Sequence, residues 1–158
     1  MEPRQEIERV FCENRERLFG FCFRMLGHRE QAEDVVQDVF LKACESGKEE
    51  PRWLFACARN RCLDLIRRRG VIHKVMDTLK RSVSWIPGFE LEVALRDQQM
   101  RVLAELSPKM RSLLLMRVYL GLNYQELAQE FDTTPEAIGV MLSRARSRLR
   151  KTLSQEES

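Results

Sequence analysis

The chain has 158 residues, of which 44% are hydrophobic and 32% are charged, and its formal net charge is +3. This balance excludes an intrinsically disordered tail, and no apolar run approaches the roughly 20 residues that a membrane span requires. The N-terminal residues are rich in Glu and Arg and lack the apolar stretch of a signal peptide. We therefore expect a cytoplasmic protein with one domain or two small ones.

Helical periodicity dominates the first 70 residues. Hydrophobic spacing predicts a first helix that stops near Gly27, a second over 29–45 and a third over 51–69 that begins at Pro51, a residue typical of a first helical turn. Residues 71–91 lack this periodicity, contain a Pro-Gly turn signal and are interpreted as a linker. Four apolar residues in the linker predict that it docks on another surface: Val83, Trp85, Ile86 and Phe89.

The C-terminal part is again helical. One helix is expected over 92–105, and Ser107 followed by proline predicts the capped start of another, which ends near Gly121. Asn123 and Glu126 have the spacing of a capping box, which opens a short helix to about residue 131. The fold class is therefore all-α, with two small helical domains over 1–70 and 92–158 joined by the 71–91 linker.

The last two helices have the proportions of a helix-turn-helix. A turn with Thr133 or Thr134 as the cap separates the short helix from a longer basic helix. The longer helix is expected to end at about Leu153, and a polar tail follows it. Opposite its buried stripe we place Glu136, Gly139, Val140, Ser143 and Ser147, flanked by Arg144 and Arg150. Its N-terminal half is suited to a major groove and its arginines to phosphates. An amphipathic hairpin within a helical bundle is the alternative.

Two segments concentrate positive charge in a nearly neutral chain. Residues 144–151 hold five basic residues and no acid, and residues 59–69 hold five against Asp64 alone. Such segments suggest nucleic-acid binding. Two solvated helix faces would explain the same charges.

The third helix carries a mixed face opposite its buried side. This face contains an aromatic ring, an amide, a carboxylate and two guanidinium groups, from Trp53, Asn60, Asp64, Arg67 and Arg68. Such groups can stack on bases, bond to base edges and hold phosphates, which suits single-stranded nucleic acid. Trp53 is equally well interpreted as packing at the helix start, and Asn60 as bonding to neighbouring backbone or the 46–52 loop.

The second helix has an acidic outer face with one exposed leucine. Its members are Asp34, Gln37, Asp38 and Leu41. This face suits a basic, helical protein surface, although a single exposed leucine is ordinary.

The five cysteines show no CxxC pair, and the chain has only two histidines. Cys57 and Cys62 lie about 140° apart around a helix. We therefore expect no metal and no cofactor, and we interpret the cysteines as reduced, mostly packing residues, with a redox role as the alternative.

Three ordered motifs, over 31–43 (QAEDVVQDVFLKA), 53–69 (WLFACARNRCLDLIRRR) and 103–153, resemble extracytoplasmic-function (ECF, group IV) sigma factors of the bacterial sigma-70 family. The first two are similar to region 2 and the last to region 4. The resemblance implies promoter-specific transcription initiation with core RNA polymerase, recognition of −35 and −10 elements, promoter melting, and inhibition by a soluble or membrane-bound anti-sigma factor. The linker would thread toward the polymerase active-site cleft and RNA exit path.

The resemblance also implies roles for individual residues. Asp34, Gln37, Asp38 and Leu41 would bind the β and β′ subunits, and the 46–52 loop would capture a flipped −10 base. The −10 strand would contact Trp53, Asn60, Asp64, Arg67 and Arg68. The −35 element would contact Glu136, Gly139, Val140, Ser143, Arg144, Arg146 and Arg148. Many relatives carry basic residues where Gly139 and Met141 stand, so base reading here would depend more on Glu136, Ser143 and Arg144.

Other classes explain less. A helix-turn-helix regulator that acts without polymerase accounts for residues 107–153 but not for the acidic face of the second helix. A helical adaptor accounts for the amphipathic stripes but not for the basic segments. We predict no enzyme, because the sequence shows no nucleophile–base set.

Overall fold

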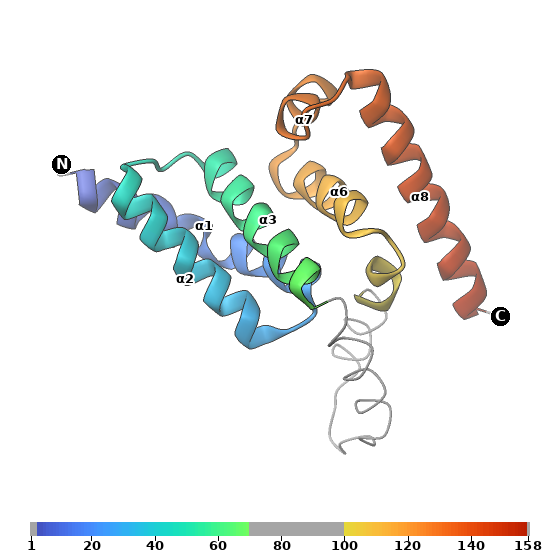
Figure 1. The fold of residues 1–158 in the computed structure, drawn as a ribbon, viewed down its shortest axis with the longest axis horizontal. Helices are drawn as coiled ribbons and strands as arrows, with labels where there is room; N and C mark the ends of the chain where they lie inside the picture. Colours follow the sequence, from blue (N-terminus) through green and yellow to red (C-terminus); the bar gives the residue numbers. More distant parts are fainter. Residues whose placement is uncertain (1–2, 70–99, 158) are drawn as a thin grey trace, which may run out of the picture.

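The computed structural model describes residues 3–69 and 100–157, and every regular element among them is helical. Figure 1 shows two groups of helices, α1–α3 and α6–α8, which we call the N-terminal bundle and the C-terminal bundle. The predicted all-α fold with two helical domains is confirmed. The predicted linker, its four apolar docking residues and the start of the helix predicted over 92–105 lie outside the described residues, and residues 100–104 are helical.

The N-terminal bundle consists of α1 (Pro3–Leu26), α2 (Arg29–Ser46) and α3 (Pro51–Arg68), close to the predicted bounds. Gly27 and Gly47 adopt φ values of +68° and +67°, which allow the chain to leave α1 and α2 in the left-handed conformation that glycine tolerates. The side chain of His28 accepts a hydrogen bond from the backbone N–H of Gln31 and caps α2. The large side chains of the core are fully buried: Leu18, Phe21, Val35, Val39, Leu54 and Phe55.

The C-terminal bundle consists of α6 (Pro108–Leu120), α7 (Tyr124–Glu130) and α8 (Pro135–Glu157). The predicted caps are confirmed: Ser107 accepts from Met110 N–H, and Asn123 and Glu126 form a reciprocal capping box. Thr134, rather than Thr133, accepts from the N–H of Ala137 and caps α8. The predicted end of α8 at residue 153 is wrong, because the polar residues that follow include no Gly or Pro and continue the helix.

The two bundles pack directly on one another through α1, α3 and α6 (Figure 1). The ring of Tyr119 on α6 lies 6.1 Å from that of Phe21 and 5.9 Å from that of Phe55. Its hydroxyl accepts a 2.6 Å hydrogen bond from Arg24, and Arg111 donates a 2.6 Å bond to the carbonyl of Met25. Buried side chains of both bundles therefore form one continuous hydrophobic cluster.

None of the helices in the described part of the chain is long and apolar enough to cross a membrane.

Candidate nucleic-acid interface

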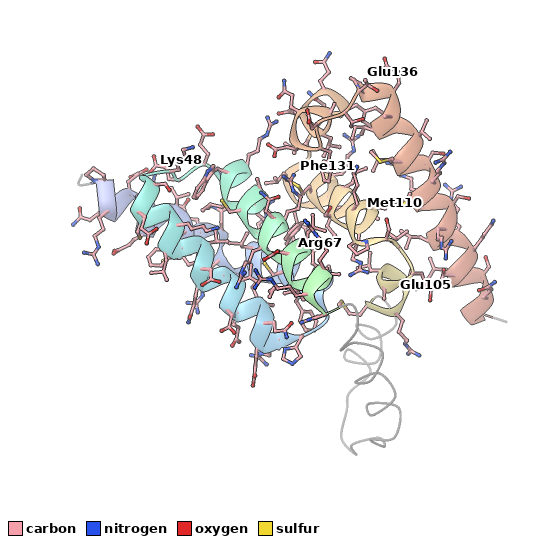
Figure 2. The ribbon with its side chains drawn as sticks, in the orientation of Figure 1. Lys48, Arg67, Glu105, Met110, Phe131 and Glu136 are labelled. Carbon is pink, nitrogen blue, oxygen red and sulfur yellow. The ribbon has the colours of Figure 1, made fainter. Side chains whose placement is uncertain are left out.

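The helix-turn-helix of α7 and α8 presents its outer face to solvent. Ile138, Leu142 and Ala145 are fully buried against the bundle. Glu136, Val140, Ser143 and Arg144 are exposed, and Gly139 is half-buried. Figure 2 shows Glu136 at the N-terminal end of α8, on the side of the molecule away from α3. The structure therefore leaves open the face that the sequence predicts for the −35 element.

The basic segment at 144–151 is exposed along α8. It comprises Arg144, Arg146, Arg148, Arg150 and Lys151. Arg148 approaches a carboxylate, that of Glu105, only at 4.0 Å with both side chains mostly exposed, and such a pair contributes little. These charges are available to phosphates.

An aromatic contact beside α8 was not predicted from the sequence. A Cβ atom at Gly139 would lie 3.4 Å from Cε2 of Tyr124, so this ring lies against the bare backbone of α8. The guanidinium of Arg117 lies 5.1 Å from the ring centroid and also donates to the carbonyl of Leu122. Only the absence of a side chain at 139 hinted at this contact in the sequence.

The mixed face of α3 is only partly free. Asn60 and Arg67 are exposed, but the Asn60 side-chain oxygen accepts hydrogen bonds of 3.3 and 3.2 Å from Arg59. The carboxylate of Asp64 pairs with Arg61 at 3.4 Å and with Arg68 at 3.3 Å. Among the described residues, the side chain of Asn60 bonds to Arg59 rather than to neighbouring backbone or to the 46–52 loop.

Trp53 and the preceding loop lie at one edge of the N-terminal bundle. Trp53 is half-buried against the hydrophobic cluster, with the ammonium of Lys48 5.9 Å from its ring centroid. Figure 2 shows Lys48 in the connection between α2 and α3, far from Glu136. Arg52 is held by the C-terminal bundle: it pairs with Glu130 at 2.6 Å and donates to the carbonyl of Glu126 at 3.1 Å.

The acidic face of α2 is accessible. Asp34, Gln37 and Leu41 are exposed, and Leu41 keeps 58% of its surface. Asp38 is half-buried and pairs with Arg61 at 3.4 Å. Leu41 and Asp38 line a cavity of about 270 Å³ between α2 and α3. The structure thus brings the four residues of this face together on one surface.

Besides Arg52, Arg59 also forms an ion pair that joins the two bundles. Arg59 is only 8% exposed and its guanidinium lies 3.5 Å from the Glu130 carboxylate, 3.4 Å from the Met116 sulfur and 4.8 Å from the centroid of Phe131. Burial lowers the pKa of Arg59, against the opposing effect of Glu130. Burial also lowers the pKa of Arg111.

A groove of about 440 Å³ lies between α3 and the C-terminal bundle. Its α3 wall includes Asn60 and Arg67, and its other wall includes Glu130 and Asp132. Figure 2 shows Phe131 beside α3 and Arg67 near the end of that helix. Two carboxylates of the C-terminal bundle therefore line the groove that contains part of the predicted −10 surface.

The prediction that the cysteines are mostly packing residues holds for three of the five, since Cys22 and Cys62 lie in the hydrophobic cluster and Cys57 packs against it. Cys22 and Cys62 are buried, Cys57 is half-buried, and Cys12 and Cys44 are exposed, all as free thiols. A hydrogen bond with Cys62, together with burial, raises the pKa of Cys22. Such protonated, buried thiols are unreactive. Within the described residues no cluster of three or more potential metal ligands occurs.

Helices α7 and α8 form a helix-turn-helix, the motif that DNA-binding proteins use to place a second helix in the major groove. The family model for sigma-70 region 2 matches residues 10–71, and that for sigma-70 region 4 matches residues 96–149. The chain belongs to the sigma-70 family, in its ECF group.

Two curated relatives illustrate the range of similarity. The chain is 31% identical to the ECF RNA polymerase sigma factor SigG of Mycobacterium tuberculosis over 85% of its own length, but it spans only 45% of that protein. It is 27% identical to the RNA polymerase sigma factor YlaC of Bacillus subtilis, over 99% of this chain and 98% of the relative.

Solved structures agree on the fold. The sigma factor RpoE of Bartonella quintana, solved in complex with the anti-sigma factor NepR, matches with a TM-score of 0.66 at 26% identity, over 95% of both chains. CnrH, solved with the cytosolic domain of CnrY, matches with a TM-score of 0.63 at 19% identity, over 96% of this chain and 97% of that one. The second match concerns the fold alone.

Proposed function

We propose that this protein is an ECF sigma factor that binds core RNA polymerase and directs promoter-specific initiation. The observation that carries the proposal is the pair of surfaces on opposite bundles: an exposed basic recognition helix and the α3 face with Asn60 and Arg67. The acidic face of α2 serves the polymerase. The protein acts in the cytoplasm without catalysing a reaction, and an anti-sigma factor, membrane-bound or soluble, controls it.

The packing of the bundles gives this function a conformational requirement. Elements at −10 and −35 lie about 25 base pairs apart, which is roughly 85 Å of B-DNA. The longest of the described helices, α1, has 24 residues and measures about 36 Å, and the recognition helix α8 has 23 residues. The recognition helix and α3 therefore cannot reach both elements while α6 and α7 remain packed on α3. The bundles must separate, and binding to core polymerase is the step that we propose separates them.

Run-off transcription tests this function. Purified chain and core polymerase are combined on a library of bacterial genomic fragments, and discrete transcripts are expected only when both are present. Gel shifts of the free protein test the alternative, a helix-turn-helix regulator that acts without polymerase. If the free protein binds the selected promoters as tightly as the complex with core polymerase does, the protein acts as an independent regulator and the proposal is wrong.

A further inference from the structure

An apolar surface lies on the face of the helix-turn-helix that is open to solvent. Val140 keeps 49% of its surface exposed and Tyr124 keeps 37%, whereas Ile138 and Leu142 are fully buried. Val140 lies two residues from each of these buried positions, which places it on the opposite side of α8. An exposed valine there has no function in the packing of this bundle.

The neighbouring position extends this surface. At Gly139 the helix has no side chain, and the Tyr124 ring lies against that backbone, 3.4 Å from where a Cβ would stand. Arg117 lies over the ring at 5.1 Å, and the capping box at Asn123 fixes the turn from which the ring projects. The ring is therefore held in place beside the recognition helix before any partner binds.

The position of the apolar surface on α8 points to a ligand. Glu136, Val140 and Arg144 are spaced four residues apart, so they follow one face at intervals of about 6 Å. The first turns of a recognition helix meet base edges in the major groove. The apolar group that bases present there is the C5-methyl of thymine.

We propose that Val140, together with the Tyr124 ring, contacts a thymine methyl in the −35 element and selects promoters with thymine at that position. This inference rests on the proposed function. It assigns base discrimination to an apolar pair, one member of which lies on α7 outside the recognition helix. Glu136 and Arg144, on the same face, flank the methyl contact with polar groups.

Replacement of thymine by uracil tests the proposal, because it removes only the methyl group. A −35 duplex is first selected from a random library with the complex of the full chain and core polymerase. Each thymine is then replaced in turn, and binding by the same complex is measured. At one or two positions the affinity should fall about fourfold, the loss expected for one methyl-sized contact, while the other positions remain unaffected.

Variants of Val140 test whether the sensitivity to uracil arises from this residue. Val140→Ala removes both γ-methyl groups and should remove the sensitivity to uracil. Val140→Thr keeps one γ-methyl group and should retain it. Leu153→Ala is the matched control: Leu153 is also an exposed apolar residue of α8, at 43% exposure, but lies about 20 Å further along the helix. It should leave the uracil profile unchanged.

The possible outcomes distinguish failure of the thymine-methyl contact from failure of the proposed sigma-factor function. A duplex that binds well with no position sensitive to uracil overturns the methyl contact and leaves the sigma-factor function standing. Unchanged uracil sensitivity in Val140→Ala, with weaker core polymerase binding, overturns it in favour of a protein-docking surface. Failure of the parent complex to retain any duplex contradicts the proposed function itself.

Discussion

The two basic segments of this chain have the same number of positive charges but different environments. In the segment at 59–69, Arg59 pairs with Glu130, Arg61 with Asp38 and Asp64, and Arg69 donates to the carbonyl of Leu26 at 3.1 Å. On α8, the five basic side chains lie exposed, and within the described residues the carboxylate of Glu105 approaches them only to 4.0 Å, at Arg148. The first segment therefore serves largely to hold the protein together, and the second is available for a partner.

The difference shows that charge density alone does not identify a binding surface. What decides is whether carboxylates lie close enough to pair with the basic groups, and for α3 these come from α2, from the end of α7 and from Asp64 on α3 itself. Glu130 lies 71 residues from Arg59 in the chain. In the packed state the surface proposed to bind the −10 element is thus partly covered, whereas the surface proposed to bind the −35 element is open.

Removal of Glu130 should have the largest effect on this contrast. Glu130→Ala leaves Arg59 buried without its carboxylate and removes one of the partners of Arg52, which should weaken packing between the bundles by about 3 kcal/mol. Urea unfolding should become less cooperative, and small-angle scattering should report a larger radius. Because α3 is uncovered, the free protein should bind a single-stranded −10 oligonucleotide more tightly.

Asp132→Asn is the matched control for that experiment. It removes a carboxylate from the same groove but keeps a residue that tolerates the positive φ of 51° at this position. It should change neither the radius nor the unfolding curve. Equal expansion in both variants would mean that general charge in the groove, rather than the pair with Arg59, holds the bundles together.

Substitutions in the exposed basic segment at 144–151 should change the salt dependence of DNA binding rather than the stability of the protein. Arg144→Ala and Arg148→Ala should each weaken binding to −35 duplexes of any sequence, and the slope of log affinity against log salt should fall by about 0.9 per lost phosphate contact. Changes at Ser143 or Glu136 should instead alter base preference. Arginine variants that change preference with an unchanged salt slope would reverse these assignments.

Local chemistry explains which parts of the structure could be predicted. The caps at Ser107, Asn123 and Gly27 depend on residues within four positions, so the sequence reveals them and the helix bounds follow. The contact of Tyr119 with Phe21 and Phe55, the pairing of Arg59 with Glu130 and the effect of Cys62 on the pKa of Cys22 depend on how distant helices pack. Periodicity can assign such residues to a face but cannot name the partner.

The acidic face of α2 contrasts with the basic segment of α3: its charged side chains are negative and mostly exposed, whereas the basic side chains of α3 are largely paired. Asp34→Lys combined with Asp38→Lys should weaken core polymerase binding, mainly through the association rate at low salt. Asp34→Lys alone is the cleaner variant, since Asp38 also pairs with Arg61. Circular dichroism should stay unchanged, and unaltered polymerase affinity at low salt would exclude this docking face.

Asn60 should give the smallest effect, confined to base discrimination. Its amide oxygen accepts from Arg59, which leaves the amide N–H groups for a base edge that becomes reachable only after the base leaves the stack. Asn60→Ala should impair transcription from a duplex promoter, and a template with an unpaired −10 region should restore opening but not discrimination. Competition between −10 strands that differ at one base, bound by the complex with core polymerase, measures this directly. A variant that discriminates as well as the parent would show that Asn60 serves only to orient Arg59, and the base would then be read by the 46–52 loop alone.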